Sequence, residues 1–187
     1  MVVPTFVDLQ GFIVRGRFVV KEVAVLRQRN VLSHYIFTNS IPWGALLKSE
    51  KSCVSWLTAY HHGLRWEDGT VPYWMARDLI TRAVYGMIKN DDNDDDDEDL
   101  VYVKGHEKRE WLKDLLDVNA RANVIIKTMD ADYEGMESLN KLDATNTIRC
   151  GKHVKSCALQ NVFKMYNCWS QHQKKIVWFE KIKIQNT

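Results

Sequence analysis

A histidine stands between two cysteines at short spacing in the stretch RCGKHVKSCALQNVF, residues 149–163. Cys150, His153 and Cys157 offer sulfur and imidazole nitrogen, which are the ligands of structural zinc sites. Three soft or borderline donors favour zinc over magnesium, and a carboxylate oxygen can complete a tetrahedron. If a helix begins near Lys152, His153 and Cys157 lie four residues apart on one face, and Cys150 approaches from the preceding loop. The stretch therefore predicts a zinc site.

The alternative is that these cysteines only pack. Cysteine is often buried as a small hydrophobe, so Cys157 would be core and His153 a surface residue. The other two cysteines, Cys53 and Cys168, are expected in the core with no further role. Nothing indicates a secreted chain, so a disulfide framework is not expected.

The charge of the chain is unevenly distributed. The sequence holds 26 basic and 24 acidic residues, and eight of the acidic ones lie in DDNDDDDED, residues 91–99. Without that run, 26 basic residues stand against 16 acidic ones. The rest of the chain is thus basic, as expected for a partner with a phosphate backbone.

Lysines and aromatic residues alternate near the C-terminus, a composition typical of surfaces that hold phosphates and stack bases. We expect single-stranded RNA to bind there. The candidate contacts are Lys164, Lys174, Lys175, Trp178, Lys181 and Lys183. The alternative is a solvated lysine face. Trp169 is expected to be buried by its helical spacing from other apolar residues, and the segment KKIVWFEKIKI, which contains Trp178, alternates as a strand does.

The elements that must position these residues begin with strands. Residues 5–14, 17–28 and 31–38 are rich in β-branched and aromatic residues and predict an antiparallel meander of three strands. Residues 45–57 and 72–89 have apolar positions at helical spacing. A strand at 100–105, a helix at 107–119, a strand at 123–128 and a helix at 156–171 follow. The pattern predicts an α/β fold, in which a mixed sheet of meander and parallel strands is flanked by helices.

One domain over residues 1–187 is the expectation, because a chain of this length buries one sizeable core. The acidic run is expected to form a flexible solvated loop over residues 90–99, since it repels itself and cannot pack. No apolar run is long enough to cross a bilayer, and the first residues do not look like a signal peptide. We expect no membrane contact and a cytoplasmic or nuclear location.

The element order resembles the ribonuclease H-like fold of the DEDD 3′ to 5′ exonucleases, in which four carboxylates hold two divalent metals. Asp8 fits the first carboxylate position. Gln10, Lys108 and Asn161 fall at the other three, so the two-metal centre is expected to be degraded. Glu107, next to Lys108, and either Asp130 or Asp132 are candidates for replacing the lost carboxylates. Whether the chain is an enzyme is left open.

The chain also resembles the Maelstrom domain, a branch of this fold found in piRNA-pathway proteins of animals. That family lacks the carboxylates and binds zinc through a Glu on the second strand, a Cys-x-x-His and a later Cys. RFVVKEVAVLRQ and CGKHVKSC match these segments, and the resemblance implies zinc ligation by Glu22, Cys150, His153 and Cys157. Glu22 lies within an apolar strand, where a carboxylate needs a partner or an exposed face.

The expected function is a zinc-stabilised domain that binds single-stranded RNA in small-RNA silencing, with silencing-pathway proteins as further partners. Two alternatives stay open. The first is an active nuclease, either a degenerate DEDD exonuclease that uses Asp8 or a metal-independent RNA endonuclease. The second is a protein-interaction scaffold whose basic face meets an acidic partner.

Overall fold

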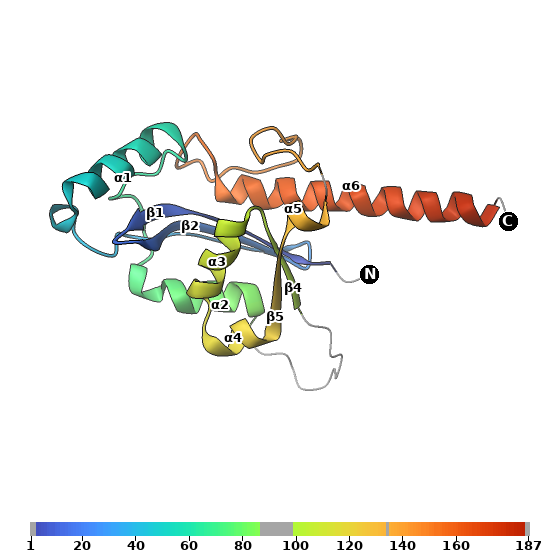
Figure 1. Cartoon of the computed structure of the whole chain (residues 1–187), viewed down its shortest axis with the longest axis horizontal. Coiled ribbons are helices and arrows are strands. Elements are labelled where there is room, and N and C mark those ends of the chain that lie inside the picture. The colour runs from blue at the N-terminus through green and yellow to red at the C-terminus, as the bar shows by residue number, and fades with distance from the viewer. Residues whose placement is uncertain (1–2, 87–98, 134, 186–187) are drawn as a thin grey trace.

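The structure is a computed structural model that describes residues 3–86, 99–133 and 135–185, with the side chains of 176–185 excepted. A sheet lies between two layers of helices (Figure 1). The strands are β1 (Thr5–Val14), β2 (Arg17–Arg27), β3 (Val31–Ile36), β4 (Asp99–Val103) and β5 (Val124–Thr128). The helices are α1 (Lys48–Tyr60), α2 (Ala76–Tyr85), α3 (His106–Leu115), α4 (Val118–Asn123), α5 (Met129–Asp132) and α6 (Ala158–Gln185), with short 3-10 turns η1 (Trp43–Ala45) and η2 (Tyr73–Met75).

The five strands form one sheet in the order β3-β2-β1-β4-β5. β1, β2 and β3 pair antiparallel, whereas β4 pairs parallel with both β1 and β5. Arg15 and Gly16, both with positive φ, form the tight turn between β1 and β2. The predicted fold class, an α/β fold with a mixed sheet flanked by helices, is confirmed.

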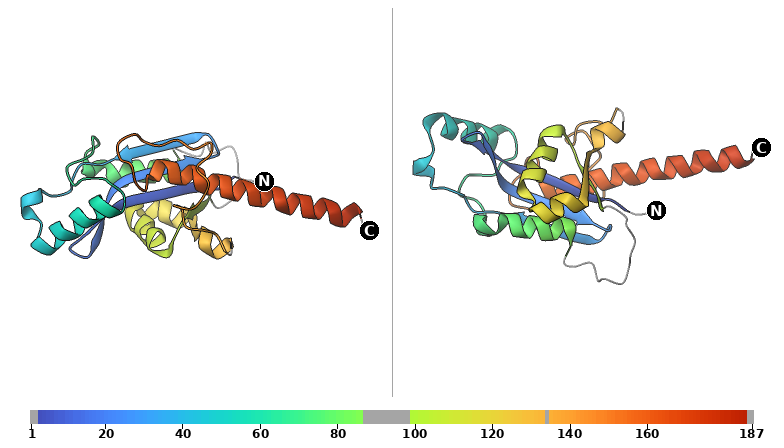
Figure 2. Two further views of the ribbon diagram at one scale, coloured as in Figure 1. Left: turned by 90° about the horizontal axis from the view of Figure 1, so that it is seen from above. Right: turned by 60° about the horizontal axis from the view of Figure 1, so that its bottom comes forward.

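Alternation along the central strands divides the core between the two faces of the sheet. On one face, Phe6, Ala24 and Leu26 pack against the first half of α6. On the other face, neighbouring valines and leucines of the same strands pack against α2 and α3. The arrangement is visible in Figure 2, where α6 runs along one face and its C-terminal part extends past the sheet. Asp8, Gln10 and Glu22 share the parity of the α6 face, so the strands turn three buried polar side chains toward this helix.

Several sequence predictions need correction. The segment KKIVWFEKIKI is helical within α6 and not a strand, because it continues the helix that the buried Val162, Met165 and Trp169 anchor on the sheet. The helix predicted over 72–89 ends at Tyr85, since Gly86 takes a φ of 89°. Trp169 is buried, as expected. The acidic run up to residue 98 lies outside the described residues.

Cysteine placement also differs in part from the prediction. Cys53 is exposed and not in the core, because it lines a hollow between α1 and α3, whereas Val54 is the residue that α1 buries. Cys168 is half-buried and packs against the core beneath α6. In the described part of the chain no helix combines the length and the apolar character needed to span a membrane.

The pairing of β1 with β2 contains a bulge. Gln10 pairs with Glu22 and Gly11 pairs with Val20, so Lys21 has no partner in the register. A Cβ at Gly11 would lie 2.2 Å from the Val19 carbonyl oxygen and 2.8 Å from the Phe18 ring. Only glycine allows the two strands to approach this closely.

We predict that Gly11→Ala lowers the free energy of unfolding by about 1–3 kcal/mol, because the added methyl group must displace backbone and ring atoms. Gly44→Ala is the matched control, since no atom lies within 4 Å of a Cβ there. Urea denaturation of both variants measures the difference. Equal stability of the two variants would contradict the bulge geometry.

Candidate metal centre

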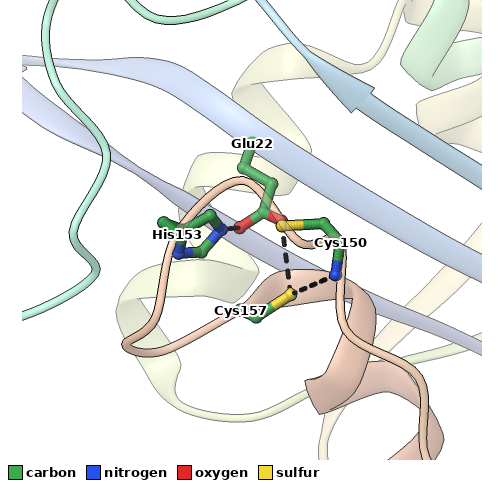
Figure 3. Close-up of side chains that lie close together, drawn as sticks. All are labelled: Glu22, Cys150, His153 and Cys157. Atoms are coloured by element: carbon green, nitrogen blue, oxygen red, sulfur yellow. Dashed lines mark hydrogen bonds and ion pairs between the residues drawn. The ribbon is translucent and has the colours of Figure 1, made fainter.

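Four side chains from two distant parts of the chain converge beneath the start of α6. Glu22 comes from β2, and Cys150, His153 and Cys157 come from the loop before α6 (Figure 3). Their ligand atoms all lie within 4.8 Å of one another. Among the described residues, no other group of three or more His, Cys, Asp or Glu side chains converges in this way. The four residues that the sequence analysis selected therefore form one cluster, which could hold a metal ion.

The orientation of His153 is set by a backbone carbonyl. Its Nδ1 lies 2.6 Å from the His62 carbonyl oxygen, and Nδ1 must carry a proton because a carbonyl only accepts. Nε2 then faces the cluster. It lies 3.1 Å from Glu22 Oε2, is buried, and has no well-directed hydrogen bond. Metal-binding histidines are commonly held by such a bond from the other ring nitrogen.

Two hydrogen-bond donors outside the four-residue cluster bind the Glu22 carboxylate. His34 Nε2 lies 2.9 Å from Oε1, and the Ala158 backbone N–H donates to Oε2 at 2.9 Å. The sequence analysis missed His34. Its signal was strand alternation, because His34 pairs with Ala24 and so shares the face that Glu22 uses.

Burial and mutual contact shift the pKa of every group in the cluster. Burial by itself raises the pKa of Glu22, but close contact with His153 and hydrogen bonds from His34 and Ala158 outweigh it and bring the pKa to about 2. Burial lowers the pKa of His153, but contact with Cys157 and Glu22 raises it to about 10.

The two thiols respond differently to burial. Burial raises the pKa of the Cys150 thiol to about 11. It also acts to raise the pKa of Cys157, but close contact with the His153 imidazole reverses the direction and lowers it. The cluster without a metal thus keeps a proton on His153 beside the Glu22 carboxylate, and a bound cation would take the place of that proton.

The spacing of the donor atoms fits a small tetrahedral ion. Bond lengths of about 2.0–2.3 Å place the ligands of such an ion roughly 3.3–3.8 Å apart. The contact between Glu22 Oε2 and His153 Nε2 is 3.1 Å, and that between Glu22 Oε1 and Cys157 Sγ is 3.7 Å. These two contacts lie close to that range, and all four ligand atoms lie within 4.8 Å of one another, so the cluster could hold such an ion.

Cys150, His153 and Cys157 lie in the segment of residues 149–157 before α6, which we call the ligand loop. Its local structure differs from the prediction. α6 begins at Ala158, so His153 and Cys157 lie in a loop and not four residues apart on a helix. The loop bends at Gly151, which has a φ of 71°. The Arg149 guanidinium bonds to the carbonyl oxygens of His153 and Lys155. This clamp, together with the Glu22 contact to Ala158, brings the ligands together where the helix does not.

The predicted carboxylate positions of a two-metal centre also meet in space, around a single carboxylate. Asp8 is fully buried, and its oxygens accept from Lys108 Nζ at 2.5 Å, Asn161 Nδ2 at 2.7 Å and Gln10 Nε2 at 3.1 Å. The Lys108 ammonium supplies the positive charge that a divalent ion would otherwise bring.

The candidates Glu107 and Asp130 do not join Asp8. Glu107 is exposed in the first turn of α3. Asp130 accepts from the Gly105 backbone N–H at 2.8 Å and pairs with Lys104. Neither belongs to a convergent ligand group within the described residues. The arrangement around Asp8 is a saturated hydrogen-bond network and lacks the ligands for two divalent ions.

The residues predicted to contact RNA are spread along α6. Lys164 is buried and donates to the Leu139 carbonyl oxygen at 2.8 Å, so it is not part of an open lysine face. Lys174 and Lys175 are exposed. The side chains of Trp178, Lys181 and Lys183 lie outside the described part of the structure, although their backbone belongs to α6.

Comparison of the chain with protein families, with curated proteins and with solved structures gives no match. The class that the fold and the site define is therefore an α/β domain with a mixed five-stranded sheet and a buried Glu-Cys-His-Cys cluster.

We predict that His153→Ala and Cys150→Ser reduce bound metal and lower the melting temperature by on the order of 10 °C, because each removes a ligand and leaves buried polar groups unpaired. Cys53→Ser is the matched control, since Cys53 is exposed and outside the cluster, and it should change the melting temperature by less than about 2 °C. Thermal unfolding and elemental analysis measure both effects. Full stability and unchanged metal content of the His153 variant would contradict the assignment.

We also predict that magnesium does not activate exonuclease cleavage, because Asp8 is already neutralised by Lys108 and the neighbouring positions carry amides. Labelled RNA incubated with and without magnesium gives the answer. Magnesium-dependent shortening from the 3′ end, abolished by Asp8→Ala, would contradict this prediction.

Proposed function

We propose that this chain is a zinc-stabilised domain of the Maelstrom type that binds single-stranded RNA in small-RNA silencing. The carrying observation is the convergence of Glu22, Cys150, His153 and Cys157. This is the ligand set that the Maelstrom resemblance implies. Silencing-pathway proteins as partners, and a cytoplasmic or nuclear location, belong to the same proposal and rest on the resemblance.

Zinc is the metal that the donor set favours. Two thiolates and one imidazole are soft or borderline ligands, which disfavours magnesium and calcium, and four donors complete a closed tetrahedral site. No position is left for a reactive water when Glu22 ligates. The proposed role of zinc is therefore structural: it joins β2 to the loop that starts α6.

Binding rather than two-metal cleavage is supported by the network around Asp8. The four positions that hold metals in the exonucleases meet here as one carboxylate, one ammonium and two amides. A phosphodiester can be held by cations without being cut, and outside residues 91–99 basic residues outnumber acidic ones.

The zinc half of the proposal predicts close to one zinc per chain in protein purified without added metal. Among the variants, Glu22→Ala should retain more zinc than Cys150→Ser or His153→Ala, because water can replace one oxygen ligand. Elemental analysis measures the stoichiometry. Folded, fully stable protein without metal would overturn the zinc assignment and remove the main support for the Maelstrom type.

The RNA half predicts binding of an unstructured oligouridine, measured by fluorescence anisotropy over a salt series. Each phosphate neutralised contributes about −0.7 to the slope of log affinity against log salt for a single strand. Double-stranded DNA and an acidic peptide serve as competitors. Preference for the acidic peptide would favour the scaffold alternative, and cleavage that persists in chelator would favour the metal-independent nuclease.

A further inference from the structure

Three hollows meet around His61, at the end of the sheet where α1, α3 and the ligand loop come together. They have volumes of about 310, 460 and 650 Å³ and share lining residues, so they form one continuous depression. The smallest is bounded by the ligand loop and the first turns of α6. We call it the loop hollow, defined by Tyr60, Arg149, Lys155, Gln160 and Lys164.

The lysines of the two larger hollows are neutralised within the protein. Lys104 pairs with Asp130, and Lys108 pairs with the buried Asp8. Exposed Glu107 adds a further negative charge to the largest hollow. An anion entering these two hollows would have to displace a carboxylate from its partner.

The loop hollow differs because its lining holds three cations and no carboxylate. Arg149 bonds to backbone carbonyls and to the Gln160 amide oxygen, Lys155 donates to the Ala59 carbonyl oxygen, and Lys164 donates to that of Leu139. All of these acceptors are neutral, and the carboxylate that acts on Lys164, that of Asp143, lies outside the lining of the hollow. A zinc ion bound by two thiolates, one carboxylate and a neutral imidazole would form a site with a net charge of −1. This is smaller than the charge of the three cations that line the hollow, so the hollow would stay positive.

The cations that line the loop hollow also act on one another. Burial lowers the pKa of Lys164 and the nearby Arg149 guanidinium lowers it further, and together they outweigh the opposing effect of the Asp143 carboxylate. Like charges gathered at one place repel each other unless an anion is bound between them. The hollow is therefore suited to a phosphate.

An exposed aromatic surface borders the same hollow. Tyr60, at the C-terminal end of α1, is 71% exposed, and Lys155 Nζ lies 5.6 Å from the centre of its ring. Trp56, one turn earlier, is 58% exposed, and its ring centre lies 5.9 Å from that of Tyr60. Large exposed rings beside cations are the arrangement on which unpaired bases stack.

The metal cluster and the loop hollow share one segment of chain. Lys155 lies between the ligands His153 and Cys157, and Cys157 itself lines the hollow. His153 Nδ1 donates to the carbonyl oxygen of His62, just after α1, so the ligand residue also docks the loop against the end of that helix. A metal ion bound by His153 and Cys157 would therefore help to position the wall of the hollow.

We propose that the loop hollow is the site where single-stranded RNA binds, with a phosphate held by Lys155, Arg149 and Lys164 and the adjacent base stacked on Tyr60. This rests on the proposed RNA-binding function, and it places the main contact at the ligand loop, away from the exposed lysines of α6. An acidic peptide fits the cations but does not account for the two exposed rings.

The test measures binding of the unstructured oligouridine by anisotropy at about 0.1 M salt. Lys155→Glu and Tyr60→Ala should each weaken binding by about tenfold, through the lost phosphate contact and the lost stacking. Lys48→Glu, the same charge change on an exposed residue at the other end of α1, should have little effect. The double variant Lys174→Glu, Lys175→Glu tests the α6 lysines and should weaken binding less than Lys155→Glu alone.

Metal content and melting temperature are measured for each variant. These measurements distinguish disruption of the ligand loop from the loss of a single contact with RNA. Should Lys155→Glu lose metal, Lys155→Gln and Tyr60→Ala carry the test, because Tyr60 lies outside the ligand loop. Duplex RNA, whose bases are paired, should bind with no dependence on Tyr60.

The outcomes separate this inference from the proposed function. If the α6 double variant binds RNA more weakly and the loop-hollow variants bind it as tightly as the wild type, the inference is overturned. The proposed RNA-binding function then stays in place. Loss with Lys155→Glu but not with Tyr60→Ala also overturns it, because the site then recognises charge alone. Wild-type protein that binds no RNA overturns the proposed function and this inference together.

Discussion

The buried carboxylate of Glu22 is the constraint on which the surrounding structure depends. Glu22 has no exposed surface. Burying a charged group in this way costs on the order of several kcal/mol for each ion unless partners surround it. The four partners of Glu22 come from three places: His34 from β3, the first N–H from α6, and His153 and Cys157 from the ligand loop. Satisfying one carboxylate therefore joins the meander, the loop and the last helix, whose residues lie more than 130 positions from β2.

The layer between the sheet and α6 contains two buried carboxylates with different solutions to the same problem. Asp8 is neutralised by a lysine and two amides, all of which come from the protein. Glu22 faces two thiols and an imidazole, and these groups become ligands when they lose a proton to a bound cation. The first solution occupies the Asp8 carboxylate with donors of the protein itself, whereas the second leaves a cluster beside it that could hold a metal ion. Gln10 connects the two, since it bonds to Asp8 and to Ser156 of the ligand loop.

This connection explains why the structural and surface features lie so close together. The ligand loop is short and contains few apolar residues, so its shape comes from polar contacts: the Arg149 clamp, the bond from His153 to His62, and the donation from Lys155 to Ala59. Its inner side faces the cluster, and its outer side forms the wall of the loop hollow.

The sequence by itself determined the elements whose signals are local. The content of β-branched and aromatic residues predicted the first two strands, observed as β1 over Thr5–Val14 and β2 over Arg17–Arg27, and the cysteine and histidine spacing together with the resemblance selected all four members of the cluster. Tertiary structure decided what local signals do not carry. The start of α6 at Ala158 depends on Glu22 accepting its first N–H, and the exposure of Cys53 depends on which side of α1 faces the sheet. Likewise, the partnership of His34 with Glu22 and that of Lys108 with Asp8 arise from strand register and helix placement, because side chains far apart in sequence meet only when the chain has folded.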